Sequence, residues 1–133
     1  MIIFQICGIG SCGKSTILKA LASRCEKIEE HYSKLSPSDI VGLYRYISED
    51  RTYTIIIGSG GDWPDVQDEI FSFYDSIKND YDIDAIFVPS RKRGYTEYFQ
   101  KLYEYLGNIE VENLITLLQI DESQLNEPDV NAQ

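Results

Sequence analysis

One short stretch of the chain restricts its fold more than any other. Residues 8–15 read Gly-Ile-Gly-Ser-Cys-Gly-Lys-Ser and match the pattern G-x-x-x-x-G-K-[ST]. They lie between an apolar run, residues 1–7, and residues 14–25, whose apolar side chains recur at helical spacing. In such an order, backbone N–H groups of the loop and the N-terminus of the helix surround an anion. The chain is therefore predicted to open with a buried strand, a phosphate-binding loop and a helix.

Each position of this loop has a chemical task. The glycines let successive N–H groups point at a phosphate, Lys14 reaches the β- and γ-phosphates, and Ser15 ligates Mg²⁺. The expected nucleotide-binding residues are Gly8, Gly10, Ser11, Cys12, Gly13, Lys14, Ser15 and Thr16. The alternative is a glycine-rich turn that holds a lysine by chance.

The first 25 residues, about a fifth of the chain, resemble the strand, Walker A loop and helix that open P-loop NTPases. That resemblance implies a Mg²⁺-nucleotide site backed by a parallel sheet. Three features found in P-loop proteins are missing here: an Asp directly after an apolar strand, the N-K-x-D motif that reads guanine, and the second lysine early in the loop that marks partition-type ATPases. The last two absences argue against a GTPase and against a partition-type ATPase. Because the guanine motif is absent, ATP is the expected nucleotide.

The rest of the chain alternates predicted strands and helices, which indicates an α/β fold. We expect a three-layer, P-loop NTPase-like sandwich with a mostly parallel sheet and one antiparallel hairpin strand. The expected elements after the first helix are a weak strand over 27–32, a hairpin of strands 39–47 and 52–57, a helix starting near Asp62, a strand over 83–88 that Pro89 ends, a helix over 96–106, and a strand or helix over 113–120.

A carboxylate that completes the magnesium site is expected after the second hairpin strand. P-loop proteins place an Asp at such a strand end, but this chain has Gly58 and Ser59 there. Asp62 follows within one glycine-rich loop and is the candidate for binding Mg²⁺ or positioning water. The alternative is that Asp62 only caps the following helix.

A basic stretch follows the predicted strand 83–88. Arg91 and Arg93 flank Lys92, and all three lie at the edge of the sheet where ligands bind in α/β proteins. An arginine there stabilises charge on a transferring phosphoryl group or holds an anionic acceptor. The candidate catalytic residues are Lys14, Asp62, Arg91 and Arg93. The alternative for the basic stretch is a solvated loop that balances nearby acids.

The overall charge argues against nucleic acid as a partner. The chain has 22 acidic and 12 basic residues, a formal net charge of −10, whereas binding a phosphate backbone needs a basic surface. Four of the acids lie in residues 121–133, which contain no base, so this segment is predicted to be a flexible acidic tail after one domain, residues 1–120. The three cysteines have no paired spacing, so neither a disulfide framework nor a zinc site is expected.

Two functions remain open from the sequence. The first is a small cytoplasmic enzyme, an ATPase or a small-molecule phosphotransferase that uses Mg²⁺ and ATP. The second is a nucleotide-dependent switch or interaction module that hydrolyses slowly or not at all. No run of the chain is long and apolar enough to span a membrane. A protein partner or a second copy of the chain is compatible with either function.

Overall fold

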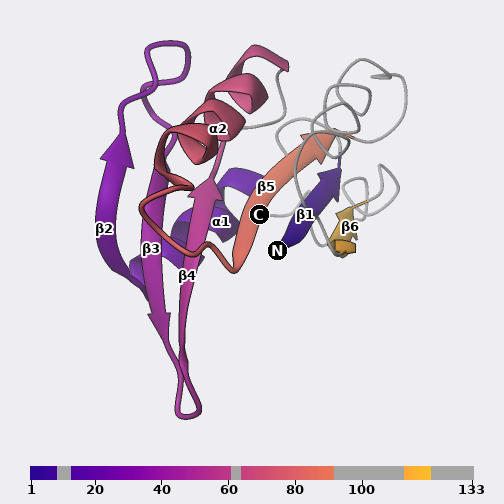
Figure 1. Ribbon diagram of the computed structural model, residues 1–133. Coiled ribbons are helices and arrows are strands. Elements are labelled where there is room, and N and C mark those ends of the chain that lie inside the picture. The colour runs from indigo at the N-terminus through magenta and orange to yellow at the C-terminus, as the bar shows by residue number, and fades with distance from the viewer. Residues whose placement is uncertain (9–12, 61–63, 92–112, 121–133) are drawn as a thin grey trace.

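The computed structural model describes residues 1–8, 13–60, 64–91 and 113–120 (Figure 1). These residues form six strands and two helices in α/β order. In chain order the elements are β1 (Ile2–Gly8), α1 (Lys14–Ser23), β2 (Glu26–His31), β3 (Val41–Ile47), β4 (Thr52–Gly58), α2 (Pro64–Ile77), β5 (Ala85–Arg91) and β6 (Asn113–Ile120).

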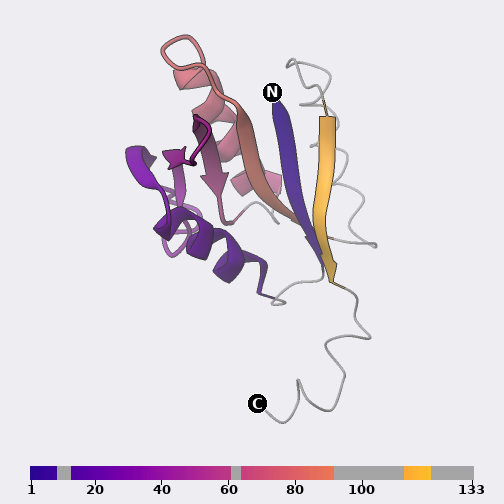
Figure 2. The same ribbon diagram turned by 90° about the horizontal axis from the view of Figure 1, so that it is seen from below.

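The strands form one mixed sheet in the order β2-β3-β4-β5-β1-β6. Strands β2, β3 and β4 make an antiparallel meander. Strand β5 pairs in parallel with both β4 and β1, and β6 pairs in parallel with β1 (Figure 2). The first strand of the chain is thus enclosed between the last two.

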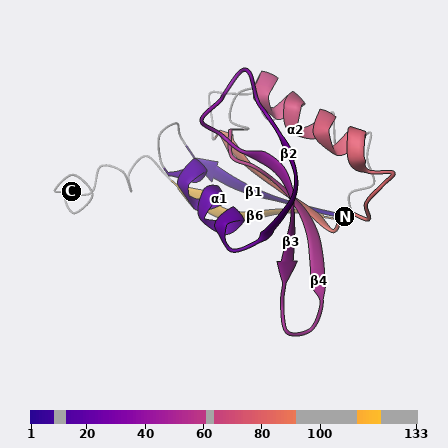
Figure 3. The ribbon, with the colours of Figure 1, turned by 90° about the vertical axis from the view of Figure 1, so that its left-hand side faces the viewer.

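The two helices cover opposite faces of this sheet (Figure 3). Strand side chains alternate between the faces, so Ile56 packs in the core below α2 while its neighbours Ile55 and Ile57 pack in the core below α1. On α2, Ile70 and other apolar residues at helical spacing complete the first core. Leu18 and Ala22 complete the second from α1.

The expected sheet is wrong. The α/β class stands, but the sheet is mixed rather than mostly parallel, and its strand order is not the P-loop order 2-3-1-4-5. The sheet is mixed because β2, β3 and β4 pair antiparallel. Its order differs because β5 pairs with both β4 and β1 and so separates the hairpin from the first strand. Sequence periodicity identifies elements but carries no information on which strand enters between which neighbours.

Strands β3 and β5 have other boundaries than the sequence predicts, and the structure decides between the two assignments left open for residues 113–120. Strand β3 begins at Val41, so Asp39 and Ile40 precede it. Strand β5 continues through Pro89, which pairs with Ile6 of β1. The proline lies beyond the part of β5 that pairs with β4, so the missing N–H removes no bond from that ladder. Residues 113–120 are a strand. The predicted helix over 96–106 and the tail over 121–133 lie outside the described residues.

The carboxyl ends of three strands and the start of a fourth lie at one edge of the sheet. Strands β1, β4 and β5 are parallel, so their carboxyl ends meet there. Because β3 is antiparallel to β4, with Val41 opposite Gly58, β3 starts at the same edge. Residues 39–40, 59–60 and the start of α1 therefore lie close together.

None of the described helices is long and apolar enough to cross a membrane.

Candidate functional site

The structure places both ends of the predicted phosphate-binding loop. Gly8 ends β1, and Gly13 is the N-cap of α1. Gly13 has φ 95°, a left-handed conformation that side chains with a Cβ rarely adopt, although a Cβ there would meet no atom within 4 Å. The glycine is needed for its backbone angle rather than for space. Gly10, Ser11 and Cys12 lie outside the described residues.

The first turn of α1 carries the charged and hydroxyl groups of the motif. Lys14 is buried, with only 4% of its surface exposed, whereas Thr16 is exposed. The Ser15 hydroxyl donates a hydrogen bond to Asp39 Oδ1 at 2.9 Å. The expected metal ligand of the loop is thus paired with a carboxylate from a different part of the chain.

Asp39 is the centre of a hydroxyl cluster. Its Oδ1 also accepts a hydrogen bond from the Ser59 hydroxyl at 2.7 Å, and its Oδ2 accepts one from the Ser36 hydroxyl. The Lys19 ammonium lies 3.9 Å from Oδ1. Only 16% of the Asp39 side chain is exposed. Asp39 joins the start of α1, the loop before β3 and the end of β4.

The hydroxyls keep this carboxylate ionised. Burial acts to raise the pKa of Asp39, but the hydrogen bonds from Ser36, Ser59 and Ser15 and the charge of Lys19 outweigh it. The pKa of Asp39 therefore lies below its ordinary value of 3.8. At neutral pH the cluster presents a negative charge beside Ser15.

This arrangement fits a small hard cation. The Ser15 proton is donated to Asp39, so the lone pairs of the Ser15 oxygen remain open to a cation. Mg²⁺ is bound by few protein oxygens and takes its other ligands from water and substrate phosphates. Among the described residues no group of three or more His, Cys, Asp or Glu side chains gathers around a point. Two protein oxygens, one of Ser15 and one of Asp39, are compatible with Mg²⁺ that takes its other ligands from a polyphosphate and water.

Asp39 is not among the residues expected at the site, because the sequence pattern places it in a strand over 39–47. A usable signal was present. The hairpin was predicted, and the first residue of its first strand must lie at the edge where its second strand ends. Asp39 in the polar stretch Ser36-Pro37-Ser38-Asp39 stands at that edge.

The other predicted catalytic residues are placed only in part. Arg91 is the last residue of β5 and pairs with Gly8 in the register of β1. The backbone at the start of the basic stretch is thus adjacent to the start of the phosphate-binding loop. Asp62 and Arg93 lie outside the described residues, so their roles stay predictions.

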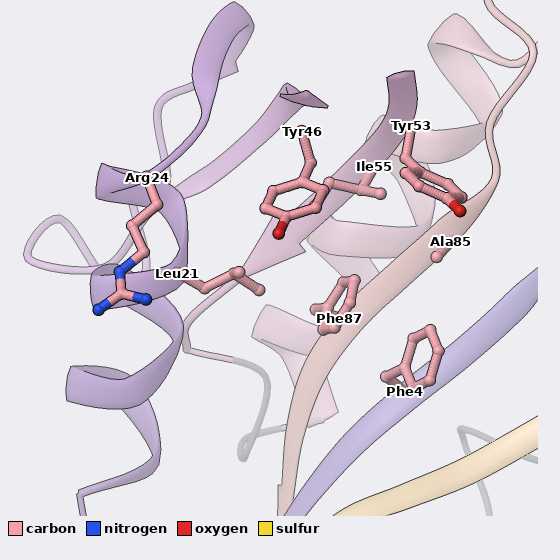
Figure 4. A pocket seen from close by; sticks show the side chains of 8 residues that line it. All are labelled: Phe4, Leu21, Arg24, Tyr46, Tyr53, Ile55, Ala85 and Phe87. Atoms are coloured by element: carbon pink, nitrogen blue, oxygen red, sulfur yellow. The ribbon is translucent and has the colours of Figure 1, made fainter. Parts of the chain in front are cut away.

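A hollow of about 360 Å³ lies at the opposite end of the sheet, on the α1 face (Figure 4). Phe4 and Phe87 stack in it with their ring centroids 4.7 Å apart, and Leu21 of α1 and Tyr53 of β4 contribute to its wall. Arg24 is the one charged side chain in this lining. An apolar surface of this kind does not supply the donors that a polyphosphate needs.

A second hollow, of about 340 Å³, lies between β2 and α2. Asp65, Asp68 and Glu69 line it together with His31. The Glu69 carboxylate accepts a hydrogen bond from the Ser33 hydroxyl, and one of its oxygens lies 3.9 Å from His31 Nε2. The acidic lining repels phosphates, so neither hollow is suited to the phosphates that the loop and Lys14 are expected to bind.

Comparisons of the chain with protein-family models, with curated proteins and with solved structures gave no match.

Proposed function

We propose that the chain binds a Mg²⁺-nucleoside triphosphate, with ATP as the nucleotide, at the carboxyl edge of β1. The hydrogen bond between Ser15 and Asp39 carries this proposal. In nucleotide sites of this kind a hydroxyl of the phosphate-binding loop and one Asp hold Mg²⁺. The proposal rests on the loop and its carboxylate partner, not on the strand order of the sheet.

Different residues would bind the phosphates and the metal ion. The N–H groups at the start of α1 and the Lys14 ammonium bind the phosphates, and the oxygens of Ser15 and Asp39 bind the metal or its waters. Buried Lys14 meets little competing solvent, so its attraction to a phosphate is stronger than at the surface. Bound Mg²⁺ would neutralise part of the negative charge of the phosphates.

Hydrolysis or phosphoryl transfer is the activity we propose for this site, with Arg91 and Arg93 as the groups that assist transfer. The neighbouring positions of Arg91 and Gly8 support this role.

A switch function has one observation in its favour. Asp39 accepts hydrogen bonds from Ser36 of the loop before β3 and from Ser15 of α1. A metal ion that binds Asp39 would therefore also change the contacts of that loop.

Calorimetric titration with ATP, with and without Mg²⁺, tests the proposal. Lys14→Ala is expected to lose most of the affinity in both conditions, because its charge contacts the phosphates. Asp39→Asn removes a negative charge beside the phosphates, so it is expected to bind ATP without Mg²⁺ at least as tightly as the wild type but to lose most of the gain that Mg²⁺ gives. Unchanged binding by Lys14→Ala would reject the phosphate site. Asp62→Asn is the matched comparison: a larger loss there than in Asp39→Asn assigns the metal to Asp62.

A further inference from the structure

Ser59 connects Asp39 to the sheet. This residue follows β4 and is 2% exposed. Its hydroxyl donates to Asp39 Oδ1 at 2.7 Å and accepts from the Ile40 N–H at 2.8 Å. Its own N–H donates to the Ile40 carbonyl at 2.9 Å. Three hydrogen bonds thus join one residue after β4 to the two residues before β3.

We propose that Ser59 is the positioning residue of the metal site: its hydroxyl fixes the Asp39 carboxylate against Ser15. This inference rests on the proposed function, because it assigns to Ser59 the geometry on which Mg²⁺ binding depends. Ser59 itself contacts neither metal nor nucleotide in this role.

The other partners of Asp39 do not hold it in the same way. Ser36 is three residues away in the same loop and moves with it. The Lys19 side chain is 41% exposed and its ammonium is 3.9 Å away, so solvent weakens its hold. Ser59, in contrast, belongs to the end of a buried strand. Among the described contacts of Asp39, the Ser59 hydroxyl is the one anchored in the sheet.

The next residue leaves room for the carboxylate. A Cβ built on Gly60 would lie 2.6 Å from Asp39 Oδ2 and 2.9 Å from its Cγ. Any side chain at Gly60 would therefore displace the carboxylate from its present position. Ser59 holds one oxygen of Asp39 and Gly60 makes space for the other, which gives this part of the glycine-rich stretch a defined role.

Two variants test the inference by different means. Ser59→Ala removes the hydrogen bond, and Gly60→Ala pushes the carboxylate by steric contact. Ser48→Ala is the matched control, because the Ser48 hydroxyl, like that of Ser59, donates one hydrogen bond and accepts one from a backbone N–H. It donates to the Arg51 carbonyl and accepts from the Arg51 N–H in the distant β3–β4 turn, so no carboxylate is involved. Circular dichroism verifies that each variant is folded.

The readout is the ratio of the ATP dissociation constants measured without and with Mg²⁺. In Ser59→Ala and Gly60→Ala this ratio is expected to fall about tenfold, the size expected for one lost charge-assisted hydrogen bond. Binding of ATP without Mg²⁺ should change by no more than about twofold, because Lys14 and the loop donors are unaltered. Ser48→Ala should leave both values as in the wild type.

A measurement without nucleotide distinguishes the positioning role of Ser59 from the proposed Mg²⁺-nucleotide binding. Hydrogen exchange at the Ile40 amide should accelerate in Ser59→Ala, which shows that the connection is lost. Faster exchange with an unchanged Mg²⁺ ratio would overturn the positioning role while the proposed function stands. An equal loss of the ratio in Ser48→Ala would also overturn it. If the wild type shows no Mg²⁺-dependent ATP binding, the proposed function fails and the inference fails with it.

Discussion

The Asp39 side chain has to stay ionised although it is largely buried, and in the proposed site it also has to attract a cation. A buried carboxylate needs hydrogen bonds to remain ionised, and three serine hydroxyls supply them. Each of these is a neutral donor, so the negative charge is stabilised without being cancelled. The residue stays charged and still attracts a cation.

The pH dependence of stability follows from the same contacts. The pKa of Asp39 is lower in the folded protein than its ordinary value of 3.8, so the ionised group stabilises the fold above that value. This contribution is lost as the pH falls through the folded-state pKa. We expect the stability difference between the wild type and Asp39→Asn to be largest near neutral pH and to shrink at acidic pH, as the pH falls below 3.8. Urea denaturation at neutral and at acidic pH measures this difference. A difference that does not change with pH would contradict the lowered pKa of Asp39.

Arg91 gives a second prediction at this scale. If its guanidinium assists phosphoryl transfer, Arg91→Ala should lower kcat much more than it weakens ATP binding, because a contact made in the transition state appears in kcat. Steady-state kinetics beside calorimetry separate the two effects. Equal losses in rate and binding would indicate that Arg91 only holds the bound substrate.

At the level of elements, the Ile70 side chain of α2 packs directly against Gly58 at the end of β4, beside the site. A Cβ on Gly58 would lie 2.3 Å from Ile70 Cδ1. The helix therefore approaches the strand closely at the point where Ser59 and Gly60 begin. Movement of α2 would be transmitted to the residues that hold Asp39.

Gly58→Ala is accordingly expected to destabilise the protein by about 1–3 kcal/mol through overpacking. Ile70→Val removes the atom nearest the new methyl group, so the alanine should cost less in the Ile70→Val background than in the wild type. Chemical denaturation of the two single variants and the double variant measures this coupling. Strictly additive losses would show that the helix shifts away instead.

Elements were easier to predict than their arrangement. The segments that became β1, α1, β4 and α2 were recognised because each combines an apolar pattern with a clear boundary. Strand β5 was predicted too short, since Pro89 was expected to end it. Asp39 was missed because its role comes from residues 15, 36 and 59, which only the folded chain brings together. Local sequence does not encode that proximity.

For the whole molecule, β6 is the strand that completes the sheet. It pairs with β1 along its length, from Asn113 opposite Ile2 to Ile120 opposite Gly8. Without β6, one side of β1 would present unpaired backbone groups at the strand that leads into the phosphate-binding loop.

A chain that ends after Glu112 should therefore be less stable and prone to self-association. A chain that ends after Ile120 keeps β6 and is expected to remain monodisperse at the same concentration. Size-exclusion chromatography with light scattering compares the two, together with their thermal melts. A truncated chain without β6 that melts like the longer one would show that β1 does not need this partner.

The position of β1 also has a consequence for how the protein is made on the ribosome. Strand β1 is synthesised first, yet its partners begin only at Ala85 and Asn113. At about 5–20 residues per second, this apolar segment waits several seconds for either neighbour. The β3–β4 hairpin, whose strands are close in sequence, can pair long before that. Until residues 85–91 have been made, β1 therefore has neither of its strand partners, and this apolar segment is one that chaperones have reason to shield.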